Sequence, residues 1–439
     1  MIIRKVWLLM IDIKLIRETP EVVKENLQKK CIDCDAAIDR ILELDAKRRK
    51  IIAVCESDKA EQNKASKEIP QIKKSGGDTT EIFARMNALK EKIRESDAEL
   101  RAVEDELDSL LLGLPNLPDD DLKPGGKENN EPLRYFGEPP EFDFEPKNHI
   151  DLCVEHGLID YPRGVKLAGS GFWIYRGLGS RLEWALLNYF IDTHINDGYE
   201  MLFVPYMLEY QCGLTAGQFP KFVDEVFRIE NPSDDRMHYM IPTAEAALVA
   251  LHRDEILTEA ELPKKYISFT PCFRREAGAY GSDERGMVRG HQFNKVEMVQ
   301  YTTPEGSPAA FEELVGKAEA LVAGLGFHYR TVKLAAGDCS PAMARTYDIE
   351  ILIPSMNGYK EVSSVSNARC YQARRGAMRF RREETGKTEF MHTLNGSGLA
   401  TSRILPALVE QNQQKDGSIV IPVALRKYLG GLEVIPRNG

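Results

Sequence analysis

The sequence predicts an α+β fold, in which an N-terminal antiparallel coiled-coil arm precedes a domain built on an antiparallel sheet with flanking helices. Three observations lead to this prediction. Apolar residues recur at heptad spacing within residues 36–112, residues 113–146 are rich in proline, glycine and aspartate, and strand patterns outnumber helical ones after residue 147. We therefore expect an N-terminal domain at residues 1–112, a linker at 113–146 and a second domain at 147–439.

The bulk composition is typical of a folded chain with more than one domain. The chain has 439 residues, of which 43% are hydrophobic, and a formal net charge of −10 at pH 7. Because the chain is acidic overall, a polyanionic partner must be met by local basic patches. The eight cysteines are scattered, as is usual in a reducing compartment. No segment approaches the ~20 apolar residues of a membrane span, so we expect a cytoplasmic protein with no membrane partner.

The N-terminal residues give two weaker signals. The apolar run in "MIIRKVWLLMIDIKLIRE" is interrupted by Asp12 and Lys14, and no small-residue cleavage site follows, which argues against a signal peptide. Cys31 and Cys34 have the spacing of metal ligands, but no second Cys or His pair lies nearby. Ordinary thiols on a helix or loop are therefore favoured over a zinc site.

Residues 36–112 have the pattern of a long antiparallel helical hairpin. Apolar residues alternate in steps of three and four, and "KSGGDTT" between the halves is typical of a turn. Because proline lacks an amide hydrogen, Pro70 is expected to kink the first helix or end it early. The expected seam consists of Ile41, Leu44, Ile51, Cys55, Ala65, Ile69 and Ile72, and of Met86, Leu89, Ile93, Ser96, Leu100, Val103, Leu107 and Leu110.

The first helix of this hairpin carries more basic than acidic side chains. Its basic residues are Lys47, Arg48, Arg49, Lys50, Lys59, Lys64, Lys67, Lys73 and Lys74. Such a run is usually a solvated helix face, but a protruding arm can also contact a partner such as RNA. The pattern alone leaves both interpretations open.

The second domain alternates helix and strand signals. "SRLEWALLNYFIDTHINDGY" has helical periodicity, and "EMLFVPYML" is expected to be a strand interrupted by Pro205. Further strands are expected at "HYMIPTAE", "YISFTP", "HQFNKVEMVQY", "YDIEILIP" and "YKEVSSVSN", and a closing helix at "GLATSRILPALVEQNQ". Few regular crossover helices separate these strands, which favours an antiparallel sheet.

Residues 272–298, "CFRREAGAYGSDERGMVRGHQFNKVEM", have the pattern of two strands joined by a glycine-rich loop. Side chains two residues apart on a strand share a face, so Arg274 lies beside Glu276, and Phe293 beside Lys295 and Glu297. A guanidinium, a carboxylate and an aromatic ring on one surface could bind phosphate, an amino group and a base. A salt-bridged surface hairpin explains the same pattern about equally well.

Two further segments carry candidate ligand-binding groups. In "NGSGLATSRIL", Arg403 follows Gly396 and Gly398, which let the backbone approach a ligand closely. In "IPTAEAAL", Thr243 and Glu245 could receive an ammonium group. The same Thr-x-Glu pattern also caps helices, so a simple N-cap is the alternative.

Three ordered segments resemble the signature motifs of class II aminoacyl-tRNA synthetases. Residues 179–208 resemble motif 1, residues 272–298 motif 2, and "NGSGLATSRILPAL" motif 3. Other segments resemble the seryl-tRNA synthetase family in particular, and the helical arm fits this family as well. These segments are "GQFPKF", "PTAE", "HQFNKVEM", "YKEVSSVSN", "QARR" and "HTLNGSGLA".

This resemblance implies an ATP-dependent ligase with a class II catalytic domain at residues 147–439. Such an enzyme activates L-serine to seryl-adenylate and transfers the seryl group to the 3′ end of serine tRNA, with selenocysteine tRNA as a further candidate. The resemblance assigns the α-phosphate to Arg274, the outer phosphates to Arg289 and Arg403, the adenine amino group to Glu276 and the adenine ring to Phe293. It places Mg²⁺ on Glu361 and Ser364, and adds Arg275, Val362 and Ser363 to the ATP-binding residues.

The resemblance also implies a serine pocket, a tRNA-binding arm and a homodimer formed through motif 1. The serine-binding residues would be Thr243, Ala244, Glu245, Arg274, Glu297, Asn395 and Ser397. A pocket of buried polar groups rejects alanine, because those groups would be left without partners. The basic arm helix would contact phosphates of the tRNA.

Several positions depart from the usual family pattern. They are Arg275, where a small residue is common, Gly290, Ser402, Val365, and Cys370 with Tyr371. Arg275 and Ser402 are the two that could alter ATP affinity. The first nine residues precede the usual family start and form an extra segment.

Two alternatives belong to other functional classes, and a third is a zinc-dependent version of the same enzyme. A serine-activating paralogue would acylate a carrier protein or a small molecule instead of tRNA, but such paralogues lose tRNA-binding parts and this chain keeps the arm. A non-catalytic RNA-binding or regulatory paralogue predicts the loss of Arg274, Glu361 or Arg403, and all three are present. A zinc-dependent enzyme needs Cys or His ligands in the serine pocket, where this chain has Thr243 and Glu245.

Overall fold

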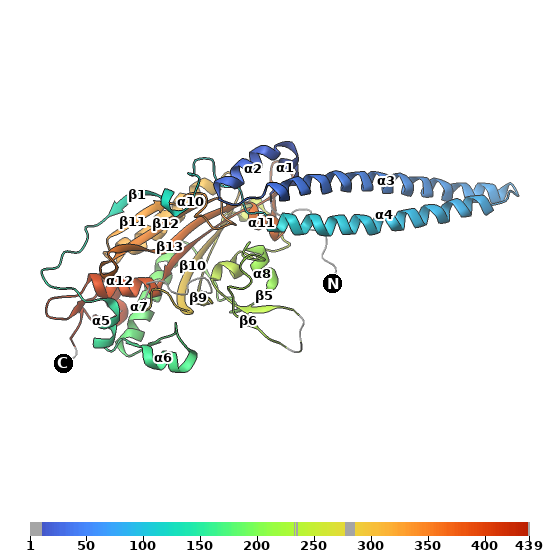
Figure 1. The fold of residues 1–439 in the computed structure, drawn as a ribbon. Coiled ribbons are helices and arrows are strands. Elements are labelled where there is room, and N and C mark those ends of the chain that lie inside the picture. Colours follow the sequence, from blue (N-terminus) through green and yellow to red (C-terminus); the bar gives the residue numbers. More distant parts are fainter. Residues whose placement is uncertain (1–10, 232, 234–235, 277–285, 438–439) are drawn as a thin grey trace. The chain divides into compact units, whose positions relative to one another are not determined.

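The computed structural model describes residues 11–231, 233, 236–276 and 286–437, drawn in Figure 1. The chain forms two compact units. The first comprises Met1–Gln28 and Asp33–Leu114, and the second comprises Lys29–Ile32 and Pro115–Gly439. The second unit therefore takes in the proline-rich segment that we expected to be a separate linker.

The first unit is dominated by two long antiparallel helices (Figure 1). Its helices are α1 (Ile13–Glu18), α2 (Pro20–Lys29), α3 (Asp35–Lys74) and α4 (Thr80–Gly113). The expected seam is buried at Ile41, Leu44, Ile51, Cys55 and Ala65 on α3, and at Leu89, Val103 and Leu107 on α4. Near the end of α4 the buried residue is Leu111 rather than Leu110. The predicted helical hairpin is confirmed.

The expectation that Pro70 ends the first helix early is wrong, because α3 continues through it to Lys74. Pro70 removes one hydrogen bond, to the carbonyl of Ser66 one turn earlier. Both residues are exposed, so water can satisfy that carbonyl. A proline in the last turns of an exposed helix is therefore tolerated.

The second unit is built on an eight-stranded sheet. In spatial order its strands are β1 (Glu131–Phe136), β11 (Tyr329–Lys333), β12 (Arg345–Ile353), β13 (Gly358–Arg369), β16 (His392–Ala400), β10 (Gln292–Thr302), β9 (Lys264–Phe273) and β4 (Glu200–Met201). All neighbours are antiparallel except β4 and β9. The predicted antiparallel α+β fold is confirmed, and strand β1 shows that part of the expected linker belongs to this sheet.

Helices and small sheets surround this sheet. The helices are α5 (His149–Glu155), α6 (Tyr161–Ala168), α7 (Leu178–Asn196), α8 (Tyr210–Thr215), α9 (Ala244–Leu248), α10 (Ser307–Gly324), α11 (Tyr371–Arg375), α12 (Thr401–Gln411) and α13 (Val423–Arg426). The small sheets are β5 (Met207–Glu209), β7 (His238–Met240) and β6 (Arg228–Ile229); β15 (Thr388–Phe390), β14 (Arg379–Arg381) and β8 (Ile256–Thr258); β2 (Ile159–Asp160) and β3 (Ile174–Tyr175); and β17 (Ile419–Val420) and β18 (Val434–Ile435).

The two faces of the main sheet pack into different cores. On β10, Val296 and Met298 join a core with α7, α10 and α12. Val299 and Tyr301 join a second core that includes α9. Because side chains alternate along a strand, the odd-numbered residues of β10, from 293 to 297, share the face of this second core. The face that the sequence predicted for them is the face on which the candidate site lies.

Local differences from the sequence expectations follow from tertiary packing. "EMLFVPYML" forms only β4 and β5, with Pro205 outside both. "HYMIPTAE" divides into β7 and the start of α9. The 18-residue helix α10 was not expected, because its sequence is apolar on most sides and lacks a clear polar stripe.

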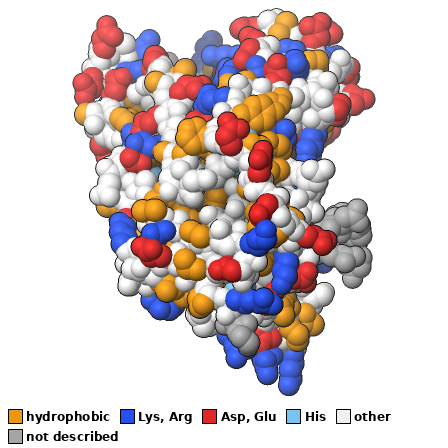
Figure 2. All heavy atoms as spheres, turned by 90° about the vertical axis from the view of Figure 1, so that its left-hand side faces the viewer, with side chains coloured by type: hydrophobic (Ala, Val, Ile, Leu, Met, Phe, Trp, Pro, Cys, Tyr) orange, Lys and Arg blue, Asp and Glu red, His pale blue; other side chains and the backbone are white. Residues whose placement is uncertain are grey.

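The surface carries both signs of charge. Figure 2 shows acidic, basic and hydrophobic side chains interspersed over one face, which agrees with the expectation that any polyanion is bound by local groups. Among the helices within the described residues, none is long and apolar enough to cross a membrane.

Candidate active site

The hairpin of β9 and β10 forms one wall of the candidate site. The register pairs Cys272 with Phe293 and Thr270 with Lys295. Beyond the strands, the backbone amide of Arg274 donates to the carbonyl of His291 over 2.9 Å. Because the chain stays paired there, Arg274 is held beside the aromatic ring of Phe293, and its guanidinium carbon lies 5.2 Å from the ring centre.

A polar cavity opens at the end of this hairpin. Its walls are Arg274, Glu276, Val288, Arg289, Gly290, Phe293, Lys295, Glu361, Val362, Ser397, Ala400, Ser402 and Arg403. In this arrangement Arg289 and Glu276 form an ion pair of 2.8 Å. The structure thus brings together the three arginines, the carboxylate and the aromatic ring that the sequence singled out.

Arg403 reaches the cavity from the first turn of α12, directly after β16. Its Nη1 donates to the carbonyl of Glu361 over 2.7 Å and lies 3.5 Å from the Glu361 carboxylate. Its Nε donates to the carbonyl of Val288 over 3.4 Å. Contacts with β13 and with the segment before β10 therefore fix the direction of this guanidinium.

Glu183 ties all three motif-like segments together beneath the cavity. This buried residue on α7 accepts hydrogen bonds from Nδ2 of Asn294 over 2.7 Å and from Oγ1 of Thr401 over 2.6 Å. Asn294 lies between Phe293 and Lys295, and Thr401 lies two residues before Arg403. Burial raises the pKa of Glu183 to about 7.

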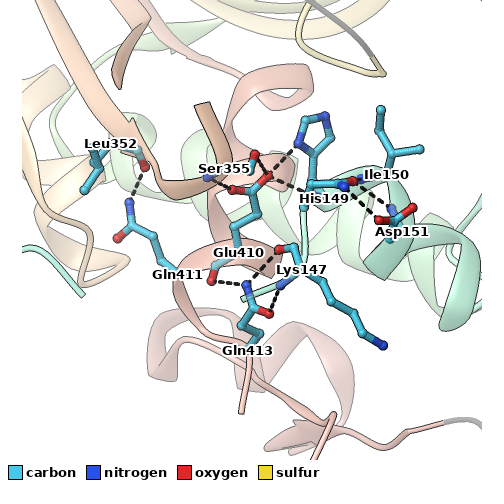
Figure 3. A network of polar contacts seen from close by, with 10 residues as sticks. Lys147, His149, Ile150, Asp151, Leu352, Ser355, Glu410, Gln411 and Gln413 are labelled. Carbon is cyan, nitrogen blue, oxygen red and sulfur yellow. Dashed lines mark hydrogen bonds and ion pairs between the residues drawn. The ribbon is translucent and has the colours of Figure 1, made fainter. Parts of the chain in front are cut away.

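The far end of α12 is anchored by a second buried carboxylate, shown in Figure 3. Glu410 accepts bonds from Nδ1 of His149 over 2.7 Å and from the backbone amide and hydroxyl of Ser355 over 2.8 and 2.7 Å. Gln413 exchanges two hydrogen bonds with the backbone of Lys147. Helix α12 is therefore fixed at both ends, which limits how far Arg403 can shift.

A larger cavity of about 540 Å³ adjoins the first and shares Arg289, Glu361 and Arg403 with it. Ser364, Ser366, Asp348, Glu350, Tyr359 and Lys360 are among its lining residues. Asp348 is buried and registers opposite Ser364. Burial and the nearby Glu361 carboxylate raise the pKa of Asp348 well above its usual value. Oxygen ligands for a hard cation are thus concentrated in this cavity.

A buried polar network lies on the same sheet face, next to the first cavity. Lys295 forms an ion pair with Glu297, and its Nζ donates to Oγ1 of Thr243 over 2.8 Å. Nδ2 of Asn395 donates to Oε1 of Glu297 over 3.0 Å. These four side chains are each less than 10% exposed. Ser397, the register partner of Glu297, lines the cavity itself.

Thr243 has the helix-capping role that was one of the two interpretations of this segment, and the binding of an ammonium group remains a prediction. Thr243 is the N-cap of α9, and its hydroxyl accepts the backbone amide of Glu245. Glu245 points its carboxylate into the buried network, where burial and the neighbouring Glu297 raise its pKa to about 7. Nε2 of Gln372 donates to Oε1 of Glu245 over 3.0 Å.

Some predicted site residues lie elsewhere. Of the predicted site residues that the structure describes, seven are not among those lining the two cavities: Thr243, Ala244, Glu245, Arg275, Glu297, Ser363 and Asn395. The Ser363 hydroxyl donates to the carbonyl of Ser397, so it supports strand β16. Arg275 donates to the carbonyl of Asp224 over 2.8 Å. Arg285, which lies in the motif 2 loop, is outside the described residues.

The sequence analysis missed several residues that support the site. Glu183, Asp348, Gln372 and Glu410 received no role, although Gln372 lies in the quoted segment "QARR". Glu183 and Asp348 are polar residues within largely apolar stretches, which is the signal that could have found them, whereas Gln372 and Glu410 have further polar residues beside them and give no such signal. Across the described residues, no three or more His, Cys, Asp or Glu side chains are grouped so that they could hold a metal ion by themselves, without oxygens from a ligand.

Comparisons with known proteins agree with this geometry. A family model described as the seryl-tRNA synthetase N-terminal domain matches residues 10–118, and one described as the tRNA synthetase class II core domain (G, H, P, S and T) matches residues 227–412. Serine–tRNA ligase 2 of Clostridium acetobutylicum is 59% identical over 96% of this chain and 99% of its own. The serine–tRNA ligase of Thermodesulfovibrio yellowstonii is 45% identical over 96% and 99%.

Solved structures point the same way. The seryl-tRNA synthetase of Pyrococcus horikoshii complexed with ATP has a TM-score of 0.92 and 33% identity, covering 98% of this chain and 100% of that one. A prolyl-tRNA synthetase of Giardia lamblia, at 13% identity and a TM-score of 0.56 over 64% of this chain, shares the fold alone. The sheet and its cavity are thus those of a class II aminoacyl-tRNA synthetase. Within that class, the chain belongs to the seryl-tRNA synthetase family.

Proposed function

We propose that this chain is a serine–tRNA ligase that activates L-serine with ATP and transfers the seryl group to the 3′ end of serine tRNA. The observation that carries this proposal is the single cavity lined by Arg274, Arg289, Arg403 and Phe293, next to the buried network of Glu245 and Glu297. The alternative of a paralogue that acylates a carrier protein has no support, because the matched relatives are serine–tRNA ligases over nearly their whole length.

The first step requires positioning more than acid–base help. An oxygen of the serine carboxylate attacks the α-phosphorus of ATP, the bond from that phosphorus to the bridging oxygen breaks, and pyrophosphate leaves with the electron pair. Arg274 stabilises the charge that develops on the α-phosphate, while Arg289 and Arg403 bind the outer phosphates. Phe293 stacks on adenine, and Glu276 accepts from its amino group.

ATP binding on this scheme exchanges contacts that the protein makes with itself. Arg274 lies over Phe293, and Arg289 pairs with Glu276. Adenine would take the place of Arg274 on the ring, and phosphate would compete with Glu276 for Arg289. Arg403 keeps its backbone contacts, so it is the most preorganised of the three arginines.

The residues of the larger cavity suit Mg²⁺. Glu361 and Ser364 would hold the ion together with phosphate oxygens, and the carboxylate of the adjacent Asp348 has an oxygen with no hydrogen-bond partner. These are hard oxygen ligands, which Mg²⁺ prefers. The bound ion would neutralise phosphate charge while the arginines orient the chain of phosphates.

Serine would bind with its ammonium group at Glu245 and its hydroxyl near Glu297, Asn395 and Ser397. Burial makes this pocket selective: alanine would leave hydrogen-bonding groups without partners, and threonine needs more space. Lys295 holds Glu297 in place through the ion pair. Thr243 completes the network as the acceptor of Lys295.

A homodimer through the motif 1 segment is part of this proposal. Trp184 and Ile195, which are 55% and 46% exposed, lie three turns apart on one face of α7. Phe203, in the following segment, is 76% exposed. Large apolar side chains so placed are typical of an interface. Phe203→Ser should shift the mass measured by light scattering toward that of a monomer, and an unchanged mass would refute this assignment.

Serine-dependent exchange of pyrophosphate into ATP, followed by charging of serine tRNA, tests the whole proposal. Exchange without charging would refute the tRNA ligase assignment. The absence of both reactions in folded protein would refute serine activation itself. A cytoplasmic location follows from this function, since the charged tRNA is used there.

A further inference from the structure

Gln372 is a fully buried residue of α11 with each of its amide atoms in use. Nε2 donates to the carbonyl of Ala216 and to Oε1 of Glu245, both over 3.0 Å. Oε1 accepts from the hydroxyl of Thr393 over 2.6 Å. Because a carbonyl can only accept and a hydroxyl can donate here, these partners fix which end of the amide carries nitrogen.

The scaffold that holds Gln372 is itself rigid. Arg375 lies three residues further along α11, on the same side of the helix. Arg375 is buried, and its side chain donates to the carbonyls of Leu214 and Phe219, each over 2.6 Å. Thr393 is a fully buried residue of β16. Helix α11 therefore connects the segment after α8 to the central sheet at the level of Glu245.

Glu245 needs such a support. Glu245 is half-buried, burial raises the pKa of its carboxyl group, and Glu297 places a second negative charge nearby. Lys295 is committed to Glu297 and Thr243, and Arg274 bonds to the carbonyl of Pro242. Among the described residues, it is Gln372 that donates a side-chain hydrogen bond to the Glu245 carboxylate.

We propose that Gln372 is a positioning residue for serine recognition, which orients the Glu245 carboxylate so that its other oxygen receives the serine ammonium group. The proposal rests on the assignment of Glu245 to serine under the proposed function. Gln372 does not touch the substrate. It acts through Glu245, and Thr393 prevents its amide from turning over.

Gln372→Met tests this by keeping a side chain of similar length while removing all three bonds. Hydrogen bonds to charged groups contribute enough to predict a ten- to hundredfold rise in KM for serine, measured by pyrophosphate exchange. KM for ATP should stay within about twofold, because neither cavity that holds the arginines contains Gln372. If Gln372 had a purely structural role, its replacement would instead raise KM for serine and KM for ATP together, or lower kcat alone.

The pH dependence gives a second readout. The Gln372 bond lowers the pKa of Glu245, as do Lys295 and Arg274, while Glu297 raises it. Serine binding should strengthen as pH rises and Glu245 loses its proton, and in Gln372→Met this acid limb of the pH profile should move to higher pH. The pH profile of KM for ATP should not move with it.

Gln300→Met is the matched control. Gln300 is equally buried, and its Nε2 bonds only to the hydroxyl of Tyr199 among the side-chain contacts of the described residues. It should lower stability without changing KM for serine. Should Gln372→Met not fold, Thr393→Val carries the test, with a several-fold rise in KM for serine expected.

The outcomes separate this inference from the proposed function. An unchanged KM for serine in folded Gln372→Met, or an equal rise in Gln300→Met, overturns the role of Gln372. If the unmodified chain shows no serine-dependent exchange, the proposed function itself is refuted, whatever the Gln372 variant shows. If Thr393→Val raises KM for ATP and serine alike, the positioning role is also overturned.

Discussion

Replacing Lys295 with methionine isolates the buried ion pair at the centre of the proposed serine pocket. Lys295 and Glu297 are 7% and 1% exposed in their side chains, and the ammonium also donates to Thr243. Methionine fills much of the same volume but carries no charge. The substitution leaves two carboxylates, Glu297 and Glu245, in the same buried network without that cation.

The expected loss is large because of this burial. Removing one partner of a buried pair costs about 3–5 kcal/mol, since the other charge is left without compensation. The exposed pair of Lys415 and Asp143, at 69% and 76% exposure, provides the control. Solvent screens such a pair, and Lys415→Met should cost no more than about 1 kcal/mol.

Urea unfolding followed by tryptophan fluorescence measures both losses, because Trp173 and Trp184 lie in the second unit. The double variant Lys295→Met with Glu297→Gln should recover most of the stability, because no unpaired charge then remains. KM for serine should rise in the single variant, since Lys295 lowers the pKa of Glu245. Equal losses in Lys295→Met and Lys415→Met, with KM for serine unchanged, would refute the reasoning.

Three further predictions concern the rest of the molecule. Arg403→Ala should slow pyrophosphate exchange about 100- to 1000-fold. The control is Arg437→Ala, which removes one partner of a surface ion pair and should leave the exchange rate nearly unchanged. Similar exchange rates in the two variants would show that Arg403 has no part in the mechanism. Burial raises the pKa of Glu183 in the folded chain to about 7, so the free energy of unfolding should fall as pH rises from about 4.5 to 7 and Glu183 ionises. Relative to the unmodified chain, Glu183→Gln should gain up to about 3 kcal/mol of stability between pH 5 and pH 8, measured by urea titration. A stability difference between the two chains that does not change with pH would contradict this. Within the described part of the arm, four lysines have no ion-pair partner, namely Lys64, Lys67, Lys90 and Lys92, whereas Lys47 pairs with Glu99. Replacing these four by alanine should reduce the salt dependence of tRNA binding by about three powers of salt concentration and leave pyrophosphate exchange intact. Loss of exchange would show that the arm also contributes to serine activation.

Heptad and strand patterns were enough to predict the arm and the sheet, because both arise from local periodicity. The seam residues Ile41, Leu44 and Val103 are buried as expected. The seam drifts by one position at Leu111, since an α-helix has 3.6 residues per turn rather than 3.5. The expectation for Pro70 is wrong because the local rule takes no account of exposure, and this part of the helix is exposed.

In the candidate site, too, local patterns predicted some features and not others. Alternation along β10 placed Phe293, Lys295 and Glu297 on one face, and the structure agrees. The role of Ser363 could not be judged in this way, because its hydroxyl bonds to Ser397 on a strand that pairs with β13 but lies far along the chain. Which groups converge depends on strand order, and no local pattern encodes strand order.

The sequence by itself determined the family, the α+β class, the helical arm and the residue types proposed to face the substrate, because these follow from periodicity and from motifs in chain order. Only the tertiary structure decided which buried polar groups support them. Glu183 joins α7 to β10 and α12, and Gln372 joins α11 to α9 and β16. Each bond connects residues more than 20 positions apart, and its strength comes from burial, which only the folded chain provides.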